Sequence, residues 1–193
     1  MKKILLIIFT IILILSINVL AVDIDIGMPA IGRSYYMGNN ITLVIKDNPA
    51  DATGKITTVE IWSYTDLANV EVATFYVVSG NNLSTRDTEY IGTVTSGAKR
   101  TFSVDLDVQT GDYLGIYLVD GDYIEKDNVG YTGIWYKAGD QISCADTAFS
   151  FQTDSTISLY GTGATAVGWD HKWNTQIISK WNTKEIVKWN GLE

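Results

Sequence analysis

The side chains that could do acid–base or nucleophilic chemistry are few in this chain of 193 residues. His171 is the only histidine and Cys144 the only cysteine. A Ser-His-Asp or Cys-His site would have to use His171, and a histidine-ligated zinc site needs more ligands than the sequence offers. The 22 acidic side chains leave a carboxylate-pair glycosidase as an alternative. We therefore predict that the protein is not an enzyme.

One acidic stretch, VDGDYIEKDNVG, has the residue types of a calcium site. Its candidate ligands are Asp120, Asp122, Glu125 and Asp127. Calcium takes many oxygen ligands, often from a single loop, but this stretch matches no defined calcium loop. The alternative is that these side chains are solvated turn residues of an acidic protein. Calcium is the one cofactor that we consider.

Four aromatic side chains are expected on the outward faces of strands, because successive strand residues point to opposite faces. Apolar neighbours alternate with these aromatics and take the inward positions, and Gly115 leaves a flat gap between two tyrosines. Sugar rings stack on such aromatic strips, and Glu60 and Lys137 could bind the sugar hydroxyls. The alternative is that the four residues pack under a loop or against another subunit. They are Trp62, Tyr113, Tyr117 and Trp135.

The elements that must position these residues are strands. About ten short stretches rich in β-branched and aromatic residues alternate with turn residues, and no stretch has helical periodicity. TFSVDLDV at 101–108 alternates between apolar and polar residues, while VEVATFYVV at 70–78 is apolar on both faces and predicts a central strand. This pattern predicts an all-β, jelly-roll-like antiparallel sandwich over residues 22–167.

The two ends of the chain differ from this body. Residues 1–21 combine a basic start, an apolar run and small residues at Val19 and Ala21, which predicts a secretory signal peptide. An uncleaved membrane anchor is the alternative, since the apolar run is just long enough to span a bilayer. We therefore expect an extracellular or cell-surface protein that does not contact the membrane once the leader is cleaved.

The distribution of charge along the chain limits the classes of partner that we expect. Residues 22–167 carry 19 acidic and 8 basic side chains, a net charge of −11, whereas residues 168–193 carry 3 and 4, a net charge of +1. An acidic body repels nucleic-acid backbones and anionic membranes. Neutral glycans, cell-surface components and other copies of the chain remain as partners.

The segment 168–193 repeats Lys-Trp-Asn at a spacing of eight residues, at Trp173, Trp181 and Trp189. In an extended chain an even spacing places all three tryptophans on one face. We interpret this tail as short β segments separated by turns. Two such strands are too few to fold alone, so the tail is predicted to be an assembly or docking element.

Several stretches resemble a group of mostly uncharacterised β-rich modules in phage, prophage and environmental bacterial sequences. They include ATGKITTVEIW, DVQTGDYLGIY and IEKDNVGYTGIWYKAGD, and the tail is similar to the I-x-K-W-N-G repeats carried beside such modules. The resemblance covers about residues 23–193 and implies an extracellular or virion-surface structural module without catalytic residues. A virion protein needs no secretory leader, so the predicted leader favours a secreted or cell-surface protein. We expect a non-enzymatic adhesion or glycan-binding module. The alternatives are a structural subunit of a phage virion or extracellular filament, or an accessory domain of a carbohydrate-active enzyme.

Overall fold

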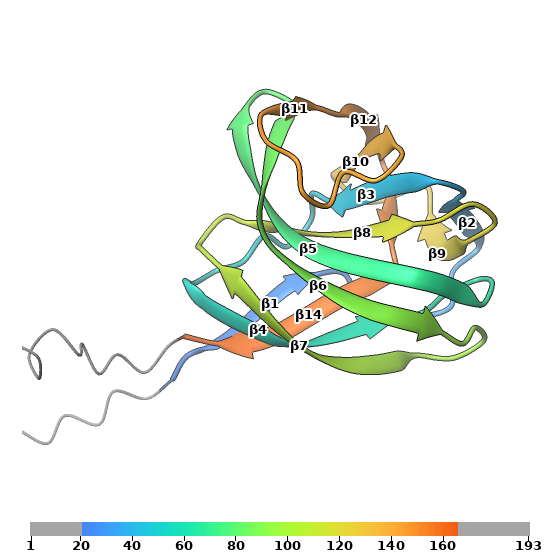
Figure 1. Ribbon diagram of the computed structural model, residues 1–193, viewed down its shortest axis with the longest axis horizontal. Helices are drawn as coiled ribbons and strands as arrows, with labels where there is room; N and C mark the ends of the chain where they lie inside the picture. The colour runs from blue at the N-terminus through green and yellow to red at the C-terminus, as the bar shows by residue number, and fades with distance from the viewer. Residues whose placement is uncertain (1–20, 166–193) are drawn as a thin grey trace, which may run out of the picture. The chain divides into compact units, whose positions relative to one another are not determined.

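The computed structural model describes residues 21–165, and everything below concerns this part of the chain. The predicted leader, apart from Ala21, and the predicted tail lie outside the described residues. Residues 21–165 contain fourteen strands and no helix (Figure 1). They are β1 (Asp23–Gly27), β2 (Tyr35–Gly38), β3 (Ile41–Ile45), β4 (Gly54–Ile61), β5 (Leu67–Ser79), β6 (Asn82–Val94), β7 (Arg100–Val108), β8 (Tyr113–Leu118), β9 (Tyr123–Asp127), β10 (Gly133–Ala138), β11 (Thr147–Ala148), β12 (Ser150–Thr153), β13 (Thr156–Ile157) and β14 (Leu159–Ala164).

Eight of these strands form a jelly roll. The first of the eight pairs with the last, the second with the second last, and so on, always antiparallel: β1 with β14, β3 with β8, β4 with β7, and β5 with β6. Such a nested set of pairs is a long hairpin that has been rolled up. Rolling yields the order β1-β14-β4-β7 in one sheet and β6-β5-β8-β3 in the other. The predicted jelly-roll-like sandwich is confirmed.

The other six strands are insertions in this framework. β2 lies between β1 and β3 along the chain, and β9 to β13 lie between β8 and β14. β10 and β12 extend the second sheet beyond β3, and β11 adds to the edge of β6, so that this sheet has seven strands. A third, small sheet has the order β13-β9-β2. No helix of residues 21–165 could cross a membrane.

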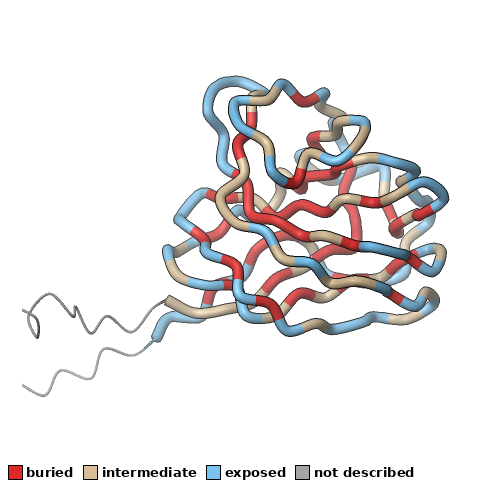
Figure 2. Tube along the Cα trace, in the orientation of Figure 1, coloured by how far each residue is buried: buried red, intermediate tan, exposed pale blue. Residues whose placement is uncertain are grey.

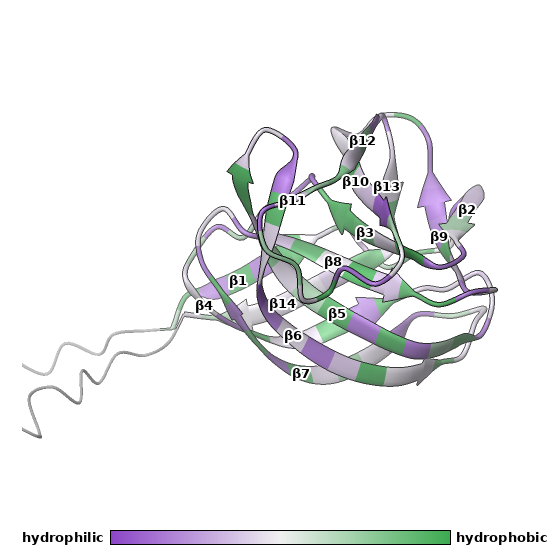
Figure 3. Ribbon diagram, turned by 45° about the horizontal axis from the view of Figure 1, so that its top comes forward, coloured by the Kyte–Doolittle hydropathy of each residue, from purple (hydrophilic) through white to green (hydrophobic). Residues whose placement is uncertain are grey.

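The main core lies between the two large sheets and is lined by alternate residues of their strands (Figures 2 and 3). In β7, Val104, Leu106 and Val108 are buried while the residues between them are exposed, as the alternation predicts. β5 is a central strand between β6 and β8, as its two apolar faces predict. Val72 enters the main core, whereas Phe75 enters a second apolar cluster on the other side of the sheet.

Candidate functional site

Three of the four predicted aromatics lie on the outer face of the seven-stranded sheet, as their parity predicts. Ile134 faces the main core, and its neighbour Trp135 belongs to the second cluster with Tyr113 and Tyr117 packed against it. However, this face is covered where the tryptophan lies, because Trp135 is only 1% exposed. The gap expected at Gly115 is also filled. A Cβ atom there would lie 2.6 Å from the ring of Phe75 and 2.8 Å from the carbonyl oxygen of Leu43.

Residues 139–149, here called the cap, cover this face. The cap follows β10 and returns over the outer side of the sheet, placing Ile142 and Phe149 on the second cluster. The Phe149 ring meets Phe75 edge to face at 6.2 Å, and Tyr113 meets Trp135 in the same way at 5.0 Å.

Polar contacts hold the cap in place. The backbone N–H of Phe149 donates to the Asn81 carbonyl at 3.0 Å, and Trp135 Nε1 donates to Asn81 Oδ1 at 2.9 Å. Lys137 Nζ donates to the Ala148 carbonyl at 3.0 Å. Lys137 therefore binds the cap rather than projecting as a free sugar ligand.

Trp62 and Glu60 belong to the other side of the sandwich. Glu60 lies in β4 of the four-stranded sheet, alternates with the buried Val59 and Ile61, and accepts a hydrogen bond from Lys99 Nζ at 2.8 Å. Trp62 follows the same strand, and its ring lies over Gly32, where a Cβ atom would be 3.5 Å away. The structure therefore does not bring the predicted sugar-binding residues onto one face. Parity assigns a residue to a side of its own strand but does not say which sheet the strand joins.

The four predicted calcium ligands lie in and before β9, and three of them already have protein partners. Asp122 Oδ2 accepts the Ala68 N–H at 2.8 Å. Glu125 Oε2 accepts the Arg33 N–H at 3.0 Å, and Asp127 forms a 2.7 Å ion pair with the same arginine. Asp120 is exposed in the turn before the strand. Within residues 21–165, no group of three or more His, Cys, Asp or Glu side chains is placed to hold a metal ion.

The buried Asp122 carboxylate and the Arg33 guanidinium both serve the architecture. Burial raises the pKa of Asp122 above its ordinary value, only partly offset by the Ala68 N–H. The side chain of Arg33 is 1% exposed, and besides Asp127 it donates to Ser158 Oγ at 2.7 Å and to the Pro29 carbonyl at 3.0 Å. These contacts tie the segment before β2 to the small sheet.

An exposed group of tyrosines lies on this same small sheet. Tyr36 and Tyr64 stack with their ring centres 4.2 Å apart and an angle of 16° between their planes. Tyr123 meets Tyr36 edge to face at 5.3 Å. Tyr36 and Tyr64 are each 52% exposed, and the neighbouring Tyr35 is 55% exposed. We call Tyr36, Tyr64 and Tyr123 the tyrosine cluster.

Three separate segments position the cluster. β2 pairs with β9 so that Tyr36 lies opposite Glu125, one position on from Tyr35. On the other side of β9, Ser63 forms a bridge to Ile124, and the N–H of Tyr64 donates to the Tyr123 carbonyl at 2.9 Å. The Tyr64 backbone is therefore fixed beside β9, and its ring reaches over to Tyr36.

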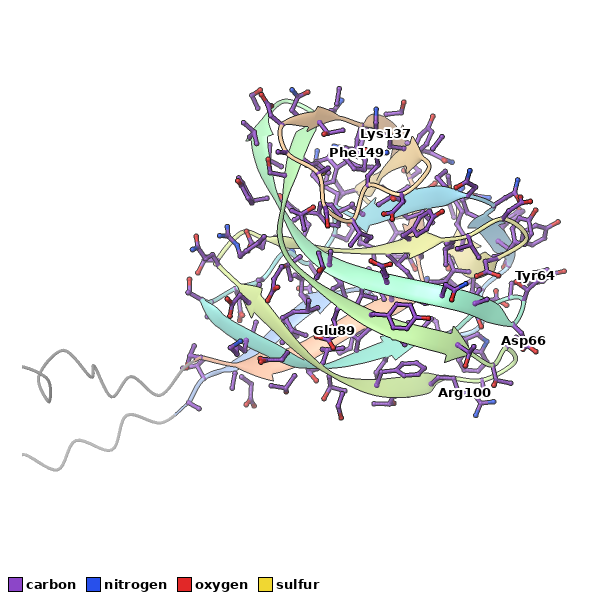
Figure 4. All side chains as sticks on the ribbon, viewed as in Figure 1. Tyr64, Asp66, Glu89, Arg100, Lys137 and Phe149 are labelled. Atoms are coloured by element: carbon purple, nitrogen blue, oxygen red, sulfur yellow. The ribbon has the colours of Figure 1, made fainter. Side chains whose placement is uncertain are left out.

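The surroundings of the cluster offer polar groups to a ligand. None of the three phenol hydroxyls makes a hydrogen bond to another side chain or carbonyl in residues 21–165, whereas the Tyr117 hydroxyl donates to Asn40 Oδ1 at 3.0 Å. Asp66 lies two residues after Tyr64, at the same end of the molecule (Figure 4). Hydrogen bonds from the N–H and hydroxyl of Ser96 lower the pKa of the Asp66 carboxyl, which keeps it charged. The exposed rings and hydroxyls thus lie at the same end of the molecule as one charged carboxylate.

Sequence analysis did not identify this cluster. Its one local signal is the Tyr35-Tyr36 pair in GRSYYMGNN, where the two rings of consecutive strand residues point to opposite faces. Comparison with protein-family models and with curated proteins found no match. The resemblance to phage and prophage modules therefore stays a prediction.

Proposed function

We propose that this protein is a secreted, non-enzymatic recognition module that binds carbohydrate at the tyrosine cluster, in an adhesion or cell-surface role. The observation that carries the proposal is the exposed stacked pair of Tyr36 and Tyr64. Both rings leave about half of their surface in water, although the same chain covers Trp135 with eleven residues of cap. A surface left open in this way is a candidate for an external ligand.

Carbohydrate fits the chemistry of the cluster better than other classes of ligand. Apolar sugar faces stack on tyrosine rings, while sugar hydroxyls need donors and acceptors at the rim. The phenol hydroxyls and the carboxylate of Asp66 can supply both. The net charge of −11 for the body disfavours anionic polymers and favours neutral sugars.

A recognition role also fits the use of the nearby carboxylates. Glu125 accepts the backbone N–H of Arg33 and Asp127 pairs with its guanidinium, so both carboxylates help to hold the segment before β2 in place. The same surface would serve an accessory domain of a carbohydrate-active enzyme, which differs from an adhesin in its neighbouring domains rather than in its site.

Binding of neutral oligosaccharides to Tyr36→Ala and Tyr64→Ala variants tests the proposal. A glycan array selects the ligand, and calorimetry measures its affinity for each variant. We expect each substitution to weaken binding by about tenfold to a hundredfold, equivalent to about 1.4–2.8 kcal/mol. Tyr90→Ala is the matched control, because Tyr90 is 60% exposed on β6, away from the small sheet. Equal losses in all three variants, or no neutral glycan bound by the wild type, would refute the assignment.

The second candidate, a structural subunit of a virion or extracellular filament, is favoured by a different observation, the open strand edge at the tip of the β5–β6 hairpin.

A further inference from the structure

The tip of the β5–β6 hairpin has an unpaired edge. β8 pairs with β5 only from Glu71 to Phe75, whereas the pairing of β5 with β6 continues to Ser79. Within residues 21–165, the backbone of Tyr76–Ser79 makes no hydrogen bond to any strand or loop other than β6. Figure 1 shows the two strands curving beyond β8 towards β11. The hairpin tip therefore presents backbone donors and acceptors to solvent along one side.

The side chains on this edge do not protect it. Tyr76, Val77 and Val78 are 38%, 39% and 46% exposed. Proteins usually shield such edges with lysine, proline or bulges. Here the protection within Tyr76–Ser79 is a register shift between Val77 and Ser79. Arg86 lies over the Tyr76 ring at 4.9 Å and bonds to Asp112, which holds the ring in place. This apolar edge can accept an added strand.

We propose that the edge Tyr76–Ser79 binds a strand from the KWN tail, residues 168–193, of a second copy of this chain. The tail supplies two strand-length segments, at 177–181 and 185–189, which end at Trp181 and Trp189. Such segments cannot fold alone and need a sheet to pair with. This inference does not depend on the tyrosine cluster or on carbohydrate binding.

Charge favours the tail over the body of another copy as the occupant. Two bodies of −11 repel each other, which opposes direct pairing of two hairpin edges. The tail carries +1 and places Lys180 and Lys188 next to its tryptophans. Its positive charge attracts it to the acidic body of another copy, and added salt weakens this attraction.

The length of the tail allows it to reach a neighbour. Residues 166–193 provide 28 residues after Thr165, and an extended chain covers about 3.3 Å per residue. This span of about 90 Å exceeds the roughly 40 Å dimension expected for a domain of this size. One tail can thus leave its own sandwich and pair with the next, which produces a head-to-tail assembly.

Sedimentation of the full chain over a range of concentrations tests the proposal. Val77→Lys and Val78→Lys each place a charge on the edge that repels the basic tail. Val129→Lys is the matched control, because Val129 is 77% exposed in the loop after β9 and the substitution adds the same charge. A tail variant replaces Trp173, Trp181 and Trp189 with serine. All variants keep residues 1–21, so any association caused by that segment is the same in each.

We expect the wild type and Val129→Lys to associate with rising concentration, and both edge variants and the tail variant to associate at least about tenfold more weakly. Mixing Val78→Lys, which retains the tail, with the tail variant, which retains the edge, should restore one contact and yield a heterodimer. Association of the tail variant as strong as that of the wild type would overturn the proposal in favour of direct pairing between edges. A wild type whose sedimentation is independent of concentration, or mixed variants that remain monomers, would also overturn it.

Discussion

Replacing Trp135 with alanine tests whether the cap belongs to the folded core. Trp135 is 1% exposed between Tyr113 and Phe151, with Lys46 Nζ 5.1 Å from its ring centre. Burying a tryptophan removes about 200 Å² of surface from water, which corresponds to about 5 kcal/mol at about 25 cal/mol per Å². Partial collapse of the cap into the space would recover some of this. We therefore expect Trp135→Ala to lower the free energy of unfolding by about 3–5 kcal/mol.

The measurement is urea unfolding followed by circular dichroism at neutral pH. Trp135→Phe separates packing from hydrogen bonding, because it keeps a ring in the cluster but removes the donor to Asn81 Oδ1. We expect this variant to lose about 1–2 kcal/mol. Trp62→Ala is the control. Trp62 is half-buried on the other sheet, so its substitution should lower the free energy of unfolding by less than Trp135→Ala does. If the free energy of unfolding of Trp135→Ala lies within about 0.5 kcal/mol of the wild-type value, the cap does not pack on the ring and the face is open.

Three further predictions concern single positions and can be checked by the same unfolding measurements. Lys126 is 7% exposed and forms no ion pair within residues 21–165, and its burial lowers the pKa of its ammonium group. The free energy of unfolding therefore falls as the pH drops from 10.5 through this lowered pKa. Lys126→Met should therefore be about 1 kcal/mol more stable than the wild type at pH 7. This gain in stability should shrink as the pH approaches 10.5. If Lys126→Met is no more stable than the wild type at pH 7, the ammonium group is solvated. Burial raises the pKa of Asp122, so its stabilising contribution is complete below the ordinary value of 3.8 and is lost as pH rises through the raised pKa. Asp122→Asn keeps an acceptor for the Ala68 N–H. This variant should be more stable than the wild type at pH 7 and as stable as the wild type below pH 3.8. A variant that is less stable than the wild type at pH 7 would contradict the burial argument. Gly115→Ala should lower the free energy of unfolding by about 1–3 kcal/mol. The added Cβ would meet the Leu43 carbonyl, which belongs to a neighbouring strand and cannot move aside. A variant as stable as the wild type would show that the sheet adjusts at this position.

The alternation of residues was enough to predict the sheet faces. Leu114, Ile116 and Leu118 of β8 all enter the main core, and β7 contains the whole alternating stretch 101–108 and begins one residue before it. The local pattern is weaker in β6, which runs from Asn82 to Val94. Its first half contains Thr85, Arg86 and Asp87 and lacks an apolar alternation. Pairing with β5 and β11, rather than local propensity, makes it a strand.

The candidate site was harder to predict than the fold, because exposure depends on connections that cross the sheets. Trp135 lies within β10 and Tyr64 follows β4, and no local pattern tells which of the two is covered. One is buried because the cap returns over its sheet, and the other is exposed because its segment ends beside β9 at the margin of the molecule. Parity could assign Trp135 to an outer face but could not say that this face would be covered.

The placement of these features suggests how the fold divides its tasks. The eight strands of the jelly roll provide most of the main core, whereas the tyrosine cluster is built from β2, β9 and the connection after β4. β2 and β9 both belong to the segments inserted between jelly-roll strands, as does the cap. Substitutions on the outer surface of the small sheet can therefore alter the proposed carbohydrate site while the paired order of the eight framework strands, and the core between them, stays intact. The hairpin tip follows the opposite arrangement, since β5 and β6 are framework strands whose own length carries them past the sheet. A change at the edge Tyr76–Ser79 should thus affect assembly and leave the tyrosine cluster unaltered, so that recognition and assembly can be separated by substitution.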